Sequence, residues 1–573
     1  MSEIRFILVL TFSLLTCCKH STNAVQEVRV RLPQDPENIN PITYTNTQGL
    51  QIINLLFQSL LYTSGTQATL EPLLAQSLPV VQRSDSTILI TYRLRPQATW
   101  DNGKPVTGND VDFSMKLIKC PGLNNEKLRM RYEAVQAVLT DSTDHSAVTF
   151  VCDKNTADPV RLTGALFILP LHIYDPDNLL KSFSLQKLTT HFDSLKTNNQ
   201  IRAYAEWFGK ESVHRQSQFL NGSGGYKVRD WQTGEHVILE RKEKWWPATL
   251  ADKPNYLTAN PPRINFHIIP DNTTALRALT TNGVDVYSNI PATDFVNLMQ
   301  DQNFRENYST FTPETHDFTY IGINSRDEKF ANRLTRQALA HLLDVPAFIK
   351  VTQKNFATRT IAPLKPDDPF YNRQIRAYEY NPQKAVQLLK QAGWENINGQ
   401  WKKFISEAAI PLEINLQYRA GNTEYENIAL IFQQAAQQIG VPVDIQPVEG
   451  STLTDNLRAH KFDMFIRGIS GSPGEYDYKS ILHTESAEVG GNNYPGFGTP
   501  ESDKLIEAIN DASNDTLKAQ LLFRFQEILH TEANPIFLYT AKNRIAVNNR
   551  LTNTRLTTSK YGFDVSAFTF SAQ

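Results

Sequence analysis

Between residues 100 and 110 the chain reads Trp100-Asp101-Asn102-Gly103-Lys104-Pro105-Val106-Thr107, followed by Gly108-Asn109-Asp110. Thr107 and Asp110 have the spacing of a capping box, in which a hydroxyl and an acid three residues later satisfy free N–H groups at a helix start. Behind them, Val111, Met115 and Ile118 recur on one helical face. The segment therefore predicts a turn followed by an N-capped helix.

Outward from this segment, the sequence predicts elements of both kinds. Residues 28–32 alternate apolar and basic side chains, as a half-buried strand does, and residues 48–61 are an apolar-rich run typical of a helix. Asn381-Pro382 and Thr499-Pro500 each place a capping residue before a first-turn proline. A helix over 428–439 is followed, after Gly440, by a strand over 441–448. The chain is therefore predicted to mix α and β, with helix-to-strand units in its second half.

Length and composition limit the class of protein. The chain has 573 residues, and since a domain has about 150 residues we expect two to four domains. Hydrophobic residues make up 40% and the mean hydropathy is −0.38, which is typical of a globular protein with a sizeable core. The 57 Lys and Arg residues nearly balance the 59 Asp and Glu residues, for a formal charge of −2. This balance excludes the basic field that a nucleic-acid partner requires.

The first residues have the pattern of an export signal. Residues 4–15 are mostly apolar, too few to span a membrane but enough for the core of a signal peptide. The run ends near Cys17-Cys18, which resembles a lipoprotein signal, where a lipid-modified cysteine follows the apolar stretch. We predict a signal peptide over residues 1–17 with Cys17 as the lipidated residue; Cys18 in that role, or an ordinary cleaved signal, are the alternatives. The protein is then exported to the periplasm or cell surface and attached to the membrane by lipid alone.

Only two other cysteines are present, Cys120 and Cys152. An oxidising compartment permits a disulfide between them. Two free thiols buried as small apolar side chains are the equal alternative. The pair is therefore a candidate disulfide.

Patterns typical of catalysis are scarce. The twelve histidines are scattered, with no HExxH motif and no Cys/His cluster at metal-ligand spacing. Gly468-Ile469-Ser470-Gly471-Ser472 approaches a nucleophile elbow but lacks its final glycine. These observations favour a binding protein over an enzyme, with no catalytic residue, metal or cofactor expected.

Four segments of the chain, in order, resemble motifs of extracellular solute-binding family 5, which includes the oligopeptide- and dipeptide-binding proteins of ABC importers. The first is the segment from Trp100 to Phe113, similar to the family's W-x-D/N-G-x-P-hydrophobic-T-A-x-D-V-x-F. The others are Gly222-Ser223-Gly224-Gly225-Tyr226 with Trp245-Trp246, Tyr320-Ile321-Gly322-Ile323-Asn324 with Arg336-Gln337-Ala338-Leu339, and Tyr380-Asn381-Pro382-Gln383-Lys384-Ala385 with Ala392-Gly393. Gly225 stands where the family usually has proline.

The resemblance implies an α/β fold of the periplasmic-binding-protein type (class II), with two lobes hinged around a ligand cleft and an additional third domain. Domain I would combine residues 27–80, 217–305 and 540–573. Domain II would be the insertion 81–216, and domain III would cover 306–539. Pro and Gly clusters near Pro79, Asn221 to Gly225 and Asn534-Pro535 mark plausible crossings between domains.

The resemblance also places the ligand. Relatives hold a peptide as an added β-strand, and a carboxylate after a G-W strand binds the ligand's ammonium, since an unpaired buried charge is prohibitive. The corresponding stretch here runs from Gly468 to Tyr478, with Ile469 in place of the usual aromatic and about two residues inserted. The candidate ligand-binding residues are Gly468, Ile469, Ser470, Glu475, Asp477 and Tyr539. For Glu475 and Asp477, the alternative to ligand binding is a solvated acid in a turn. For Tyr539, the alternative is a tyrosine of the hydrophobic core.

The function implied is the lipid-anchored, substrate-binding component of an ABC importer. It would act as a monomer, capture peptides or a similar small solute, and deliver them to permease subunits. A receptor of the same fold for a nickel chelate or an oligosaccharide is the first alternative. An exported hydrolase is the second.

Overall fold

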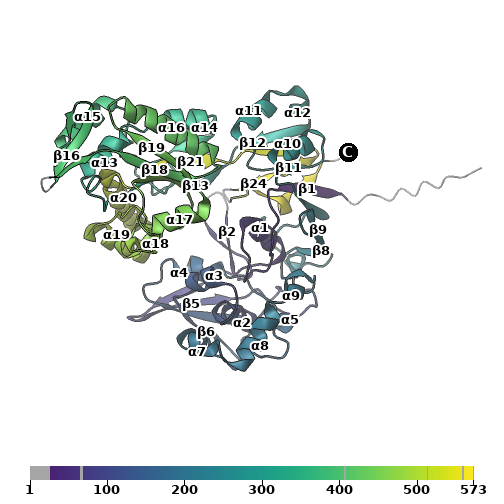
Figure 1. Ribbon diagram of the computed structural model, residues 1–573. Coiled ribbons are helices and arrows are strands. Elements are labelled where there is room, and N and C mark those ends of the chain that lie inside the picture. Colours follow the sequence, from purple (N-terminus) through teal and green to yellow (C-terminus); the bar gives the residue numbers. More distant parts are fainter. Residues whose placement is uncertain (1–25, 65–68, 406–407, 513, 558–559, 572–573) are drawn as a thin grey trace, which may run out of the picture.

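The computed structural model describes residues 26–571, apart from 65–68, 406–407, 513 and 558–559. Three main β-sheets organise these residues, and each sheet is the centre of one domain (Figure 1). The predicted signal peptide, with Cys17 and Cys18, lies outside the described residues. Within the part of the chain that the structure describes, no helix is long and apolar enough to cross a membrane.

Domain I is assembled from both ends of the chain. Its elements are β1 (Glu27–Leu32), α1 (Thr47–Leu56), β2 (Leu61–Thr63), β3 (Leu70–Pro72), β8 (Tyr226–Gln232), β9 (His236–Arg241), β10 (Arg263–Ile268), α10 (Asn272–Thr280), β11 (Val286–Tyr287), α11 (Ala292–Gln300), α12 (Gln302–Asn307), β12 (Tyr308–Phe311), β22 (Ile545–Asn548), β23 (Leu551–Thr552), β24 (Arg555–Leu556), β25 (Phe563–Asp564) and β26 (Thr569–Phe570). Seven strands form one sheet in the order β12-β22-β11-β1-β10-β9-β8, in which β1 is parallel to β10 and β11.

Domain II is a single insertion between β3 and β8. Its elements are β4 (Val80–Arg83), β5 (Thr87–Arg93), α2 (Gly108–Lys119), α3 (Glu126–Arg131), β6 (Val135–Thr140), β7 (Ala147–Asp153), α4 (Pro159–Gly164), α5 (Leu171–Tyr174), α6 (Leu185–Thr190), α7 (Phe192–Leu195), α8 (Asn199–Phe208) and α9 (Glu211–Arg215). Its four strands form an antiparallel sheet in the order β4-β5-β7-β6.

Domain III forms the rest of the molecule. Its elements are β13 (Glu314–Ile323), α13 (Arg333–Ala340), α14 (Val345–Gln353), β14 (Ala357–Arg359), α15 (Pro382–Gln391), β15 (Glu395–Ile397), β16 (Gln400–Ile405), β17 (Ala408–Pro411), β18 (Ile414–Arg419), α16 (Thr423–Gln437), β19 (Val443–Val448), α17 (Gly450–Arg458), β20 (Met464–Ser470), α18 (Lys479–Leu482), α19 (Pro500–Asp511), α20 (Asp515–Glu532) and β21 (Ile536–Lys542). Its six-stranded sheet has the order β14-β21-β13-β20-β18-β19, with β18 parallel to β19 and β20.

The hydrophobic cores divide the three domains into two lobes. One continuous core runs from Val28 and Phe266 of domain I to Phe150 and Phe208 of domain II. Domain III has separate cores on the two faces of its sheet, because neighbouring residues of β13, such as Tyr320 and Ile321, pack into different clusters. Domains I and II therefore form one lobe and domain III forms the other.

Two chain crossings join the lobes. The first lies between β12 and β13 and the second between β21 and β22, and they contact each other where the Asn543 N–H donates to the Pro313 carbonyl (2.8 Å). Since β12 pairs with β22 in the domain I sheet, the first crossing lies after Phe311, later than the predicted boundary at 306. Arg544 spans the second crossing, because it donates to the Ile290 carbonyl (2.6 Å) and to Gln353 of α14 (3.1 Å).

Local signals in the sequence correspond closely to the helix starts. Asp110 accepts from both the N–H and the hydroxyl of Thr107 (2.9 Å each), which confirms the predicted capping box. Asn381 and Thr499 cap α15 and α19 as predicted. The helix predicted over 48–61 ends earlier, at Leu56, because the chain turns there to form a β-bridge between Ser59 and Phe167 of domain II.

The candidate disulfide is not formed. Cys120 follows α2 and Cys152 lies in β7, and both are free and buried. Desolvation raises the pKa of each thiol to about 12, so both are neutral apolar side chains at physiological pH.

Candidate functional site

The parallel strands of domain III end at one edge of its sheet. In domain III, β18, β19 and β20 end at Arg419, Val448 and Ser470, beside the residues that run from the hinge into β13. Helix α16 begins at the same edge, where Asn422 caps it by accepting from the Tyr425 N–H (3.0 Å). In α/β sheets, ligands bind outside the carboxyl ends of parallel strands. This edge is therefore the candidate ligand site of domain III.

Strand β20 has an open edge at this end. Its partner on one side, β13, pairs along the whole of it, from Met464 to Ser470. On the other side, β18 pairs only with Met464 and Phe465. Within the described residues, 466–470 have no strand partner on that side. Their free N–H and C=O groups form a template to which an extended peptide can add.

Two carboxylates lie near the end of β20, over the neighbouring strand β13. Asp317 is directly opposite Ser470 in the sheet and accepts a hydrogen bond from its hydroxyl. Glu424, in the first turn of α16, accepts from Tyr539 (2.7 Å) and from Thr319 (3.3 Å), both through Oε1. Neither acid forms an ion pair with a residue that the structure describes. These two negative charges can receive a cationic group of a ligand.

Arg467 of β20 supplies the opposite charge. Its guanidinium carbon lies 5.0 Å from the centre of the Tyr494 ring. One of its nitrogens, Nη1, is buried and has no hydrogen-bond partner among the described residues. A buried, unpaired donor on the strand with the open edge is suited to a carbonyl or carboxylate of a ligand.

The predicted residues of β20 divide between the two faces of the sheet. A Cβ on Gly468 would lie 2.8 Å from the Tyr425 hydroxyl, so this position requires glycine while the tyrosine stays in place. Ser470 lies on the same face and contacts Asp317. Ile469 points to the opposite face and packs against the core around Phe318 and Phe465. The structure therefore places Gly468 beside Tyr425 and Ser470 beside Asp317, whereas the Ile469 side chain points away from them.

Tyr539 positions the carboxylate of Glu424. Its ring is fully buried, and its hydroxyl donates to Glu424. Desolvation, reinforced by the Glu424 charge, raises the pKa of Tyr539 well above its usual value. The hydroxyl thus stays protonated and holds the Glu424 carboxylate in place.

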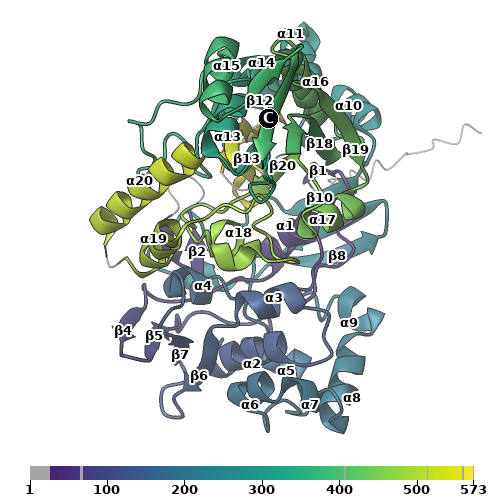
Figure 2. The same ribbon diagram turned by 60° about the vertical axis from the view of Figure 1, so that its left-hand side comes forward.

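Glu475 and Asp477 lie in the loop after β20 and face a different space. They line a cavity of about 750 Å³ between domain III and residues 130–162 of domain II. Figure 2 shows α18, which follows this loop, lying over α3 and α4 of domain II. Asp477 accepts from the Lys479 N–H (3.0 Å) and from Asn510 (3.1 Å), which fixes the start of α18. Both acids are exposed, and their part in ligand binding stays a prediction.

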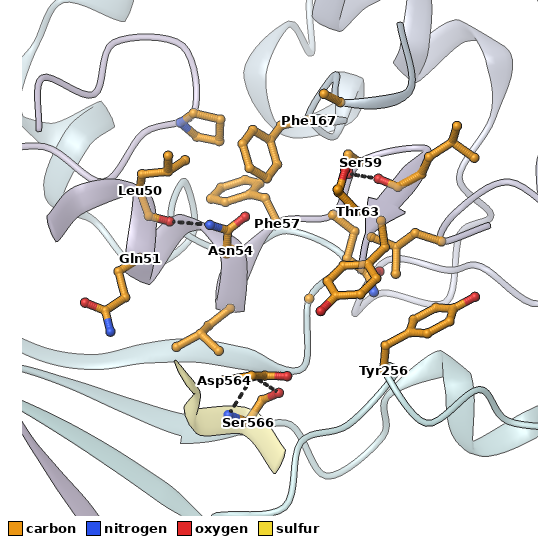
Figure 3. A pocket seen from close by; sticks show the side chains of 18 of the residues that line it. Leu50, Gln51, Asn54, Phe57, Ser59, Thr63, Phe167, Tyr256, Asp564 and Ser566 are labelled. Carbon is orange, nitrogen blue, oxygen red and sulfur yellow. Dashed lines mark hydrogen bonds between the residues drawn. The ribbon is translucent and has the colours of Figure 1, made fainter. Parts of the chain in front are cut away.

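A second cavity, of about 430 Å³, lies between domains I and II (Figure 3). Phe57 follows α1 in domain I, Phe167 comes from domain II and Tyr256 from the loop before β10; all three line the space. Arg131, the last residue of α3, lines both this cavity and the larger one. Arg131 therefore lies between the two cavities.

Comparison with known proteins identifies the family. Residues 69–490 match the family model described as bacterial extracellular solute-binding proteins, family 5 middle. The chain belongs to this family. Oligopeptide-binding protein AppA of Bacillus subtilis (strain 168) is 24% identical over 526 residues, which cover 90% of this chain and 86% of that protein. Peptidoglycan-binding protein YepA of Agrobacterium fabrum is 24% identical over 509 residues, or 80% of this chain and 75% of that protein.

Solved structures show the same fold. The structure of AppA from Bacillus subtilis in complex with a nonapeptide has a TM-score of 0.69 at 23% identity, covering 96% of this chain and 99% of that one. NikA from Brucella suis in complex with Fe(III)-EDTA has a TM-score of 0.74 at 17% identity, covering 95% and 100%. The predicted family and the two-lobed α/β fold with a third domain are therefore confirmed.

Sequence reasoning missed Asp317 and Glu424, the two acids near β20 of this family 5 protein. Glu424 reads as an ordinary acid in the first turn of a helix capped by Asn422, where it complements the helix dipole. Asp317 reads as a polar residue in a strand. The pairing of β13 with β20 places Asp317 opposite Ser470, and the packing of α16 places Glu424 against Thr319 of the same strand β13.

Proposed function

We propose that this family 5 protein captures peptides in the cleft between its lobes and delivers them to the permease subunits of an ABC importer. The open edge of β20 is the observation that carries the proposal, because an added strand binds through backbone groups that every peptide has. AppA, which is similar over most of this chain, is an oligopeptide-binding protein.

Acidic and basic side chains near β20 support a ligand that carries both a positive group and a carbonyl or carboxylate. Asp317 and Glu424 are suited to the ammonium at a peptide N-terminus, since a desolvated ammonium requires a carboxylate partner. The unpaired Nη1 of Arg467 is suited to a carbonyl or carboxylate further along the peptide. Glu475 and Asp477 are kept as alternative anchors for the ammonium.

Closure of the lobes would couple binding to delivery. A ligand favours the closed form only if it contacts both lobes and binds more tightly when they are closed. Domains I and II move as one lobe because they share a core, and domain III moves as the other about residues 312–313 and 543–544. We infer that the permease recognises the closed form, and that the receptor acts as an exported monomer attached to the membrane through a lipid on Cys17.

Two measurements test the proposal. Native mass spectrometry of the purified protein should show a bound mass that dissociates and fragments as peptide. Titration calorimetry with synthetic peptides should give saturable binding, and incubation of the same peptides with the protein should leave them intact. Absence of binding across a broad peptide panel would refute the peptide assignment, and cleavage of the peptides would favour a hydrolase instead.

A further inference from the structure

The cavity between domains I and II is lined mainly by aromatic and aliphatic side chains. Tyr62 and Tyr256 stack there with ring centroids 5.1 Å apart. Phe57 and Phe167 approach it from the two domains (Figure 3). Its volume of about 430 Å³ lies within the range of about 300–1,000 Å³ that is typical of sites for small ligands.

Several polar groups in the wall are already occupied by the protein. Oδ1 of Asp564 accepts from the N–H (3.0 Å) and the hydroxyl (2.6 Å) of Ser566, and its Oδ2 pairs with Arg555 (3.0 Å). The Asn54 amide donates to the Leu50 carbonyl (2.9 Å). These bonds occupy part of the hydrogen-bonding capacity of the two side chains.

Three tyrosines of the wall are oriented in the same way. The hydroxyl of Tyr561 donates to the Thr47 carbonyl (2.7 Å), that of Tyr256 to the Pro72 carbonyl (2.8 Å) and that of Tyr226 to the Pro261 carbonyl (3.1 Å). Each ring thus has its polar end bonded to the backbone and its apolar surface available. Such rings gain free energy by burying apolar ligand surface.

We propose that this cavity is a subsite for a bulky apolar group of the ligand, namely an aromatic or large aliphatic side chain of the bound peptide. The inference rests on the proposed function and deepens it. Arg131 is exposed and lines both this cavity and the larger one, which the loop after β20 also lines through Glu475 and Asp477. The larger cavity is then the route by which a ligand held at β20 extends toward domain II. The receptor would thus prefer peptides that carry a large apolar residue, while tolerating variety elsewhere.

The test uses peptides that differ at one position. A peptide with tryptophan placed at each position in turn is compared with the all-alanine parent by titration calorimetry. At one position, tryptophan should raise affinity at least tenfold, as expected for burial of a large aromatic surface. The variant Asn54→Trp places a large side chain at the cavity wall and should remove this preference, with the affinity for the parent peptide unchanged.

The matched control is Asn307→Trp. Asn307 is also an exposed helical asparagine that donates to the carbonyl four residues earlier (2.8 Å to Asn303), but it does not line the cavity. This variant should keep the preference for tryptophan. A preference that survives Asn54→Trp, or wild-type binding that is equal for all the peptides, would overturn the subsite while leaving the peptide function intact.

An apolar dye separates failure of the subsite from failure of the proposed function. N-phenyl-1-naphthylamine should fluoresce on binding to the wild-type protein and to Asn307→Trp, but several-fold less with Asn54→Trp. If no peptide binds and the dye shows this pattern, the apolar subsite stands and the peptide assignment is wrong. If the dye binds all three proteins equally, the subsite is wrong whatever the peptides do.

Discussion

The hydroxyl of Tyr539 donates a hydrogen bond of 2.7 Å to Oε1 of Glu424. Tyr539 lies in β21, the strand that runs into the second hinge crossing, and Glu424 lies in the first turn of α16. The bond therefore ties the candidate ligand anchor to a strand that connects the two lobes. A ligand cation bound to Glu424 would therefore lie one hydrogen bond away from the strand that enters the hinge.

Glu424→Gln should weaken binding of a peptide with a free N-terminus by about 2–5 kcal/mol, because removing one partner of a desolvated charge pair leaves the ammonium unpaired. Acetylation of the peptide N-terminus should remove most of the difference between mutant and wild type. Titration calorimetry measures both. Glu426→Gln, an exposed acid in the same helical turn, is the control and should bind as the wild type does.

The same measurement applies to the loop after β20. If Glu475→Gln or Asp477→Asn shows the loss of about 2–5 kcal/mol and Glu424→Gln does not, the ammonium anchor lies in that loop. Wild-type affinity in all three would place the anchor elsewhere or show that the ligand has no amine.

Gly468→Ala should reduce peptide affinity and destabilise domain III by about 1–3 kcal/mol, the usual effect of overpacking. The added methyl group would lie 2.8 Å from the Tyr425 hydroxyl and must displace it. Adding Tyr425→Phe removes that hydroxyl and should restore much of the loss. Urea unfolding and calorimetry on the single and double variants test the pair, and an absence of rescue would show that the strand itself is distorted.

Asp285 should make stability sensitive to acid. Its side chain is fully buried between Arg29 (2.9 Å) and Arg550 (2.6 Å). Burial alone would raise the pKa of Asp285, but hydrogen bonds from Arg550 and Arg29 outweigh it and hold the pKa below its usual value. A lowered folded-state pKa gives stability that is present above the unfolded pKa of about 3.9 and is lost as the pH falls below it.

Asp285→Asn should therefore lower the free energy of unfolding by about 3–5 kcal/mol at neutral pH, since it leaves two cations without their partner. The loss should shrink as the pH falls below about 4. Chemical unfolding across pH measures this. A deficit that is the same at neutral and acid pH would contradict the ionic origin.

Ligand binding should close the lobes. Small-angle scattering of the protein with a bound peptide should give a smaller radius of gyration than without it, because domain III rotates about residues 312–313 and 543–544. Arg544→Ala removes the contacts to Ile290 and Gln353 across the second crossing and should change affinity by altering the balance between the open and closed forms. An unchanged radius with peptides that demonstrably bind would rule out closure.

The lipid anchor is tested in cells. Cys17→Ser and Cys18→Ser are compared for partition into detergent, and the variant that loses the lipidated residue should move to the aqueous phase. If both variants stay in the detergent phase, neither cysteine carries the anchor.

The sequence alone determined the family, the mixture of helices and strands and most helix starts, because these depend on short-range patterns. Thr107 with Asp110, Asn381 with Pro382 and Thr499 with Pro500 each act within one turn of helix, so a few neighbouring residues suffice. The family motifs likewise lie within continuous segments.

The site was decided only by the tertiary structure. Asp317 contacts Ser470 because β13 pairs with β20, and Glu424 contacts Thr319 of β13 because α16 begins at the same end of the sheet. The open edge of β20 exists because β18 diverges after Gln417, and the apolar cavity exists because domains I and II pack with a space between them. Each of these features depends on contacts between distant segments, which no local pattern of residues specifies.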